Sequence, residues 1–242
     1  MTSLLYNAET WADANVNGLE VKYRRILKCI LGVSKTTCSE FLYIELGVLS
    51  IKVRIKLKQW NFWRKISQLD EENPLKHVID TARIHDLKEY RYYENLSRTY
   101  TAKEEIIHEF FEETRSSIRR KAESGRSKYI TYMEINPLLE TPKCYYQLVK
   151  KRQVSMIAKL RMSCHNLQIE MGRRTNIPRD LRLCCCGEEI EDESHFLLRC
   201  RLYSEVRRKH GINEGFSLYK LLNGGEYVYY VEEISLKRNE FT

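Results

Sequence analysis

The sequence predicts a mostly α-helical protein in which a helical region precedes a small cysteine-rich module. Apolar residues recur at three- and four-residue spacing in several stretches, which is the period of an amphipathic helix. Glycines follow the predicted helices where these end. Four of the eight cysteines and one of the six histidines lie in the stretch RLCCCGEEIEDESHFLLRC, residues 182–200. With 242 residues, the chain is long enough for one or two hydrophobic cores.

The first predicted helices lie in the N-terminal quarter of the chain. Residues 19–31 carry apolar side chains at helical spacing, and Gly32 is a stop signal. A short helix is expected from Ser39 to Leu46, ended by Gly47. The segment from Ile51 alternates like a strand in its first half, but Trp60, Trp63 and Ile66 return to helical spacing, which favours a helix.

The middle of the chain contains a clearer amphipathic helix. Over residues 102–122, Ile106, Phe110, Thr114 and Ile118 share one face, and a Ser-Gly pair follows at Ser124. The three tryptophans, Trp11, Trp60 and Trp63, are expected to be core anchors rather than platforms for base stacking.

The C-terminal half is expected to contain a basic helix, a loop and two short helices. The basic helix ends near Met162 and has apolar positions at Tyr146, Val149, Met156, Ile157 and Leu160. A loop with Pro178 leads on to the cysteines. Two short helices are expected around Gly224 and Gly225.

The positive charge of the chain is concentrated in one segment. Residues 143–182 hold ten basic and two acidic residues, a net charge of +8, and the whole chain also carries +8. A local basic segment is the footprint expected for a protein that binds phosphate backbones. The alternative is a solvated helix face without a partner.

The sequence also argues against some classes of protein. The N-terminus has no basic start followed by an apolar run, and no stretch approaches the length of a membrane span. We therefore expect a protein of the nucleus or cytoplasm that is not secreted and has no membrane partner. Disulfides are rare in those compartments, so clustered cysteines there indicate metal binding or reactivity.

The cysteine cluster offers four ligands in two close pairs, as a structural zinc site requires. Cys184 and Cys186 form a C-x-C pair before Gly187, and His195 with Cys200 forms an H-x4-C pair. Such a site would be a folding element without a catalytic role, because protein ligands fill every position. The alternative is a set of free thiols beside a surface histidine.

Other residues near these pairs receive different interpretations. Cys185 is surplus, although it could replace either neighbour. Phe196 with Leu197 or Leu198 would form an apolar floor, whereas Cys164 and His165 are expected to be packing or loop residues. The intervening carboxylates are expected to be solvated: Glu188, Glu189, Glu191, Asp192 and Glu193.

The string IAKLRMSCHNLQIEMGRRTNIPRDLRLCCCGEEIEDESHFLLRCRLYSEVR, which starts at Ile157, resembles the C-terminal zinc-binding region of non-LTR (LINE-type) retrotransposon reverse transcriptases. In that family a basic "KLR" helix, an "H-x-L-x-IE-x-GR" segment and a cysteine-rich knuckle follow one another in this order. The strings SLLYNAETW and KYRRILKCILGVSKTTCSEFLYIELG likewise resemble the thumb end of the polymerase region. The resemblance covers nearly the whole chain and is weakest over residues 70–128.

The resemblance implies a structural zinc ion bound by Cys184 or Cys185, Cys186, His195 and Cys200. Many relatives space the first pair as C-x2-C, but Leu183 occupies that position here, so the first ligand stays open between Cys184 and Cys185. The chain has no Asp-Asp dipeptide for a polymerase palm, and we expect neither reverse transcriptase nor nuclease activity from it alone. The expected segments are a thumb-like part (1–70), a helical connector (71–128), a basic helix and loop (129–182), a zinc knuckle (183–210) and a helical tail (211–242).

Two functions follow from these observations. The first is a nucleic-acid-binding C-terminal fragment of a reverse transcriptase, which binds element RNA or target DNA and could associate with a missing polymerase core. Its phosphate contacts are expected at Lys150, Lys151, Arg152, Lys159, Arg161, Arg173 and Arg174. The second is a non-catalytic helical scaffold or interaction remnant of a decayed mobile element, which would self-associate through its N-terminal apolar helices.

Overall fold

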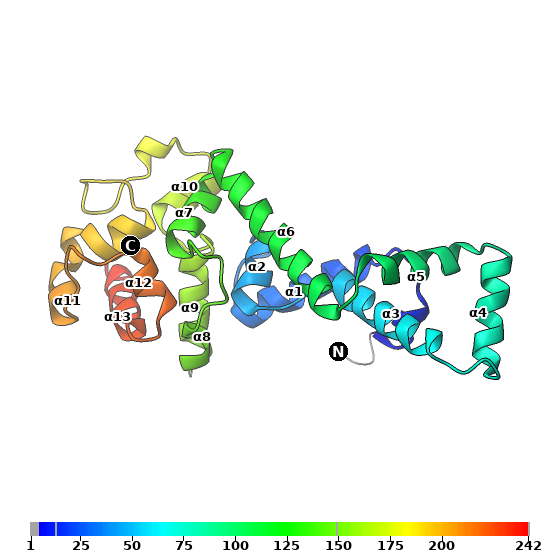
Figure 1. Ribbon diagram of the computed structural model, residues 1–242. Helices are drawn as coiled ribbons and strands as arrows, with labels where there is room; N and C mark the ends of the chain where they lie inside the picture. Colours follow the sequence, from blue (N-terminus) through cyan, green and yellow to red (C-terminus); the bar gives the residue numbers. More distant parts are fainter. Residues whose placement is uncertain (1–4, 13, 149, 242) are drawn as a thin grey trace. The chain divides into compact units, whose positions relative to one another are not determined.

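The computed structural model describes residues 5–12, 14–148 and 150–241, and over these residues the protein is mostly helical, as predicted (Figure 1). No β-strand occurs in this part of the chain; an isolated antiparallel bridge joins Leu183 and Ile190. No helix among the same residues is long and apolar enough to cross a membrane. The chain divides into two compact units, and the three boundaries between them fall within α1, between α2 and α3, and within α6.

Unit 1 comprises Met1–Arg24 and Val48–Ser116. It contains the first parts of α1 and α6, whose bounds are given below. Its other helices are the 3-10 turn Ala8–Thr10, α3 (Ile51–Ser67), α4 (Pro74–Ile84) and α5 (Lys88–Thr99). The strand alternative for the segment from Ile51 is therefore wrong. The Ser50 side chain caps α3 by accepting from the Val53 N–H, and a Glu20 carboxylate oxygen accepts from the Ile51 N–H at 2.8 Å.

The core of unit 1 is aromatic. Trp60 packs with Leu96, Tyr100 and Ile106, and its indole N–H donates to the Tyr100 carbonyl at 2.9 Å. Trp63 is 9% exposed and its ring stacks on that of Tyr93. The prediction that tryptophans anchor a core is confirmed for Trp60 and Trp63, because both are buried among apolar side chains.

Unit 2 comprises Arg25–Gly47 and Ser117–Thr242. The predicted early and middle helices are confirmed as α1 (Asn17–Leu31), α2 (Ser39–Leu46) and α6 (Lys103–Glu123). Gly47 ends α2 in the left-handed region, at φ +58°, as a glycine at this position permits. The other α-helices of unit 2 in the described residues are α7 (Ser127–Ile135), α8 (Cys144–Gln147), α9 (Lys151–Arg161), α10 (Gln168–Arg174), α11 (Ser204–Lys209), α12 (Leu218–Asn223) and α13 (Val228–Arg238).

A continuous hydrophobic core joins the cysteine-rich segment to the helices around it. It includes Ile157 and Leu160 from α9, Phe196 and Leu197 beside the histidine, and apolar residues of α12 and α13. The two C-terminal helices predicted around the glycine pair are confirmed, and α13 packs against α9. The cysteine-rich segment is therefore part of the core of unit 2.

The expected single helix ending near Met162 is wrong in its first half. The chain forms the short helix α8 and then α9, and Leu148 and Lys150 between them have extended backbones. An extended residue interrupts the ladder of i→i−4 hydrogen bonds, so one helix cannot continue through this segment. Tyr146 is accordingly 83% exposed, and Val149 lies outside the described residues.

Candidate metal centre

Two short local structures bring the four predicted ligands together. The first is a tight turn held by the bridge between Leu183 and Ile190, in which the Cys184 N–H donates to the Glu189 carbonyl at 2.8 Å. Gly187 takes φ +78° in this turn, a conformation that side-chain-bearing residues rarely adopt. The turn places Cys184 and Cys186 side by side.

The second structure is a π-helical turn, His195–Arg199. Its hydrogen bond runs from the Cys200 N–H to the His195 carbonyl over 2.7 Å, so residues five apart close one turn. This wider turn brings His195 and Cys200 to the same side, which explains the H-x4-C spacing. Isolated π-helical turns are rare and are frequently found at functional sites.

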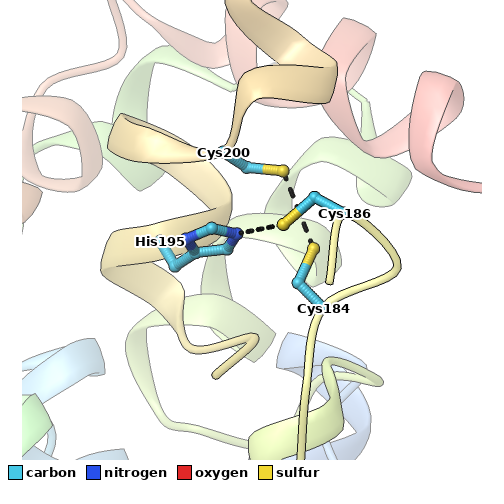
Figure 2. A group of neighbouring side chains, drawn as sticks. All are labelled: Cys184, Cys186, His195 and Cys200. Atoms are coloured by element: carbon cyan, nitrogen blue, oxygen red, sulfur yellow. Dashed lines mark hydrogen bonds between the residues drawn. The ribbon is translucent and has the colours of Figure 1, made fainter. Parts of the chain in front are cut away.

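The four side chains point toward one another (Figure 2). Their ligand atoms all lie within 4.8 Å of one another, and all four residues are buried. The Sγ atoms of Cys184 and Cys200 are 3.6 Å apart, and Cys186 Sγ is 3.3 Å from His195 Nε2. A Cys3His cluster able to hold a metal ion is thus formed by Cys184, Cys186, His195 and Cys200.

These distances fit a tetrahedral site. With metal–ligand bonds of about 2.0–2.3 Å, two ligand atoms around one tetrahedral ion lie about 3.6–3.8 Å apart. The separations of 3.6 and 3.3 Å are close to those edges, the remaining pairs lie within 4.8 Å, and the sulfur–sulfur distance is far longer than the bond of a disulfide, about 2.05 Å. All eight cysteines are free thiols. The cluster therefore has the geometry of a metal site and not of a cross-link.

The thiols differ in acidity. Burial raises the pKa of Cys184 and of Cys200 above the ordinary cysteine value. Burial acts in the same direction on Cys186, but the backbone N–H groups of Glu188 and Glu189 and the neighbouring thiols together lower the pKa of Cys186. Because a metal binds thiolates, it has to displace protons from the first two sulfurs, and its affinity must fall as the pH falls.

The second nitrogen of the histidine faces a carboxylate. Nδ1 of His195 lies 3.3 Å from a Glu189 oxygen, which Arg199 also contacts at 3.0 Å. A carboxylate beside the free nitrogen of a metal-binding histidine is the usual outer-shell arrangement, since it fixes the ring and its tautomer. The expectation that Glu189 is merely solvated overlooked this contact, because no sequence spacing relates the two residues before the turn folds.

The structure resolves the choice of first cysteine. Cys184 is 3% exposed and lies in the cluster, whereas Cys185 is exposed and lies outside it. Cys185 lies within the turn between the two outer cysteines, which the Gly187 N–H closes by donating to the Cys184 carbonyl at 2.8 Å. Phe196 and Leu197 form the apolar floor that the sequence predicted, at 2% and 0% exposure.

Two carboxylates expected to be solvated are buried, which corrects that interpretation. Glu191 forms a paired contact with Arg238, at 2.7 and 2.9 Å, and accepts from the Gln168 N–H. Glu193 accepts from the Ser163 hydroxyl and lies 2.8 Å from His165 Nε2. A buried charge is tolerated where such partners satisfy it.

These contacts fix the elements around the cluster. Although burial opposes the charged form, the hydrogen bonds and charge from His165 together with the Ser163 hydroxyl hold the pKa of Glu193 below its ordinary value. His165 is therefore a packing residue, as expected, and the pair of Glu191 with Arg238 ties α13 to the turn.

One predicted nucleic-acid contact is wrong. Arg161 is fully buried, and two of its nitrogens donate to the Glu45 carboxylate at 2.7 and 2.8 Å. Its third donates to the Leu222 carbonyl and the Asn223 side chain. The periodicity of α9 already placed Arg161 beside apolar positions, but only the fold shows that Glu45, far away in sequence, neutralises it.

Two more of the predicted contacts are engaged within the protein. Arg173 pairs with Glu170 and donates to the Ser127 hydroxyl. Arg174 is exposed but donates to the His165 carbonyl at 3.0 Å, which closes the loop before α10. Their guanidinium groups hold the loop and helix in place, so they are weaker candidates for a phosphate contact than free cations.

The remaining four predicted contacts are exposed and unpaired. Among the residues that the structure describes, no carboxylate lies within ion-pair distance of them, and no hydrogen bond engages their side-chain nitrogens. We call this set the basic face; it consists of Lys150, Lys151, Arg152 and Lys159. Cations left unpaired in this way are available to an external anion.

Comparisons with models of protein families, with curated proteins and with solved structures find no match for this chain.

Proposed function

We propose that the protein binds RNA or DNA through the basic face and that a structural zinc ion in the Cys3His cluster keeps the surrounding fold in place. The observation that supports this function is the set of four exposed, unpaired cations in unit 2, at the start and along α9. A protein surface of this kind attracts a polyanion, because each neutralised phosphate releases condensed counterions.

Zinc is the metal that the donor set favours. Three thiolates and one imidazole are soft and borderline ligands, which select zinc over magnesium or calcium, and a closed tetrahedral site is typical of structural zinc. The four protein ligands leave no position for a water molecule, so the ion would contribute folding energy and no hydrolytic chemistry. Nε2 of His195 faces Cys186 Sγ, whereas Nδ1 lies beside Glu189, and this arrangement supports a metal on Nε2.

The metal would support the basic face through the contacts around it. Glu193, two residues before the proposed ligand His195, accepts from the Ser163 hydroxyl, and Ser163 follows the residue that caps the end of α9. Glu191 holds α13, which packs on α9. Loss of the metal would therefore loosen the helix that carries the cations, in addition to the turn itself.

The resemblance to non-LTR retrotransposon reverse transcriptases supports element RNA or target DNA as the polyanion. Under this proposal the chain acts as the C-terminal, nucleic-acid-binding part of such an enzyme and has no polymerase activity by itself. Incorporation of labelled nucleotide on a primed RNA template by the purified chain, abolished by a chelator, would contradict the second statement.

The test is a salt-titrated binding assay with labelled RNA and DNA. If all four cations contact phosphates, affinity should fall roughly 50- to 150-fold between 50 and 200 mM salt. Charge reversal at Lys150, Lys151 and Arg152 should abolish most binding. The matched control reverses three exposed cations elsewhere in unit 2, Arg119, Arg120 and Lys143, and should lose much less affinity at the same net charge. Equal loss in both variants would reduce the binding to nonspecific attraction.

A specific observation also favours the alternative function of an interaction scaffold. No residue of α4 is buried, and its apolar residues Leu75, Val78 and Ile84 are 54%, 63% and 75% exposed. Exposed apolar side chains on one helix mark a surface suited to a protein partner. Concentration-dependent self-association in sedimentation experiments, together with no salt-sensitive nucleic-acid binding, would favour this function over the first.

A further inference from the structure

A pocket of about 320 Å³ lies between α9 and α13 in unit 2. The loop that contains His165 and Leu167 also lines it, as does Phe196, next to His195 of the Cys3His cluster. Its volume is at the lower end of the range for small-molecule sites, so it suits one small ligand and not a helix or a duplex.

The charge of this pocket distinguishes it from its surroundings. Its lining includes Arg152 and Lys159 of the basic face and contains no carboxylate. Of the other lining residues, Arg238 pairs with Glu191, and the His165 ring lies 2.8 Å from a Glu193 oxygen. Four other pockets in the described part of the chain each have at least one glutamate in their lining. The unpaired charge of this pocket is therefore positive.

The rest of the lining is mixed, because Ser155, Asn166, Ser235 and Asn239 contribute polar groups beside an apolar part. Met156 and Leu160 of α9 lie between or beside the two cations along the helix, and Leu167 and Phe196 complete the apolar part. Arg152 and Lys159 are seven residues apart, which is two helical turns and about 10 Å along the helix axis. Both therefore lie on one side of α9, with apolar side chains between them.

A pocket with an apolar part, uncharged polar groups and two unpaired cations matches the chemistry of a nucleotide. We infer that this pocket binds one unpaired nucleotide, with the base against Met156, Leu160 and Leu167 and the phosphate groups on Arg152 and Lys159. The inference rests on the proposed function and specifies the form of nucleic acid: a base in a duplex is paired and stacked, so a single strand or a loop is the substrate.

Three probes test whether the pocket binds a nucleotide within a strand or a free nucleotide. The first is a labelled oligothymidylate, the second is a strand of the same length with every base removed, and the third is a free nucleoside monophosphate. Base contacts in single-strand binding contribute about 5- to 150-fold per base. We expect the intact strand to bind at least fivefold more tightly than the abasic strand, which carries the same phosphates.

Variants separate the pocket from the basic face. Ser235→Phe fills the pocket without changing the charge and should bring the affinity ratio of the two strands close to one. Asn239→Trp at the exposed end of α13 is a second filling variant if the first does not fold. Lys159→Ala and its matched control Lys151→Ala each remove one unpaired cation. Both should weaken both strands, but only Lys159 lines the pocket, so only Lys159→Ala should also weaken mononucleotide binding.

Each outcome has a defined meaning. If neither strand binds at low salt, the proposed function itself fails. If both strands bind equally and the mononucleotide does not bind, the pocket inference is overturned while the basic face stands. The third outcome is that the two strands bind equally, while the mononucleotide binds wild type and not Ser235→Phe. The pocket then binds a free nucleotide and not a nucleotide within a strand, which supports the inferred ligand chemistry.

Discussion

Replacement of Arg161 by methionine tests whether this residue belongs to the fold or to a nucleic-acid surface. Its side chain is fully buried, and it donates four hydrogen bonds, two of them to Glu45. The Glu45 carboxylate also accepts from the hydroxyl groups of Tyr132 and Tyr145, at 2.7 and 2.6 Å. Burial opposes the charge of Arg161, but the negative charge of Glu45 outweighs it and raises the pKa of Arg161.

The magnitude follows from what remains after the substitution. Methionine fills part of the space, but the buried Glu45 carboxylate keeps only its two tyrosine donors and loses its countercharge. Removal of one partner from a buried ion pair costs about 3–5 kcal/mol. For a domain of this size each kcal/mol lowers the melting temperature by about 2–4 °C, so we expect a decrease of roughly 6–20 °C.

The assay is thermal and urea unfolding followed by circular dichroism. The control is Arg152→Met, which removes an exposed, unpaired arginine from the same helix and should change stability by less than about 0.5 kcal/mol. The double variant Arg161→Met with Glu45→Leu should recover part of the loss, because it no longer leaves a buried charge alone. If Arg161→Met were as stable as Arg152→Met and instead lost nucleic-acid affinity, the burial argument would be refuted.

Three further predictions concern the metal and the acid limb of stability. Elemental analysis should find one zinc per chain in wild type and in Cys185→Ser, but none in Cys184→Ser, since only Cys184 lies in the cluster; equal zinc in both variants would contradict this. Glu189→Ala should weaken metal affinity about tenfold in a chelator competition, because it removes the carboxylate beside His195, and unchanged affinity would exclude that role. Burial would raise the pKa of Glu40, but hydrogen bonding and charge from Lys121 outweigh it and hold this pKa below its ordinary 4.5. The contribution of the Glu40 carboxylate to the stability of the fold is therefore present above pH 4.5 and is lost as the pH falls through the lowered pKa. Glu40→Gln should therefore destabilise the protein by up to about 1 kcal/mol near neutral pH, and urea unfolding should show the difference narrowing in acid; a difference that grows in acid would reverse the sign of this argument.

The sequence by itself determined the helices whose signals are local. Ser39, Gly47 and the apolar period of residues 19–31 act within one or two turns, so helix α2 and most of α1 could be predicted closely. The cysteine cluster was also visible in the sequence, because both ligand pairs are formed by residues five or fewer positions apart. That the four side chains meet at one point, as a bound metal ion would require, needed their coordinates.

Only the tertiary structure decided which charged residues are available to a ligand. Arg161 and Lys159 are two residues apart on one basic helix, yet Glu45 neutralises the first inside the core and the second lines an open pocket. Glu191 and Glu193 looked solvated among their acidic neighbours, but Arg238 and His165 hold them in the interior. The sequence gives the number and positions of the charged residues. It does not give their ion-pair partners, because these come from distant segments that only folding brings together. Electrostatic function depends on those partners, and for this reason the proposed polyanion surface is reduced from seven predicted residues to the four of the basic face.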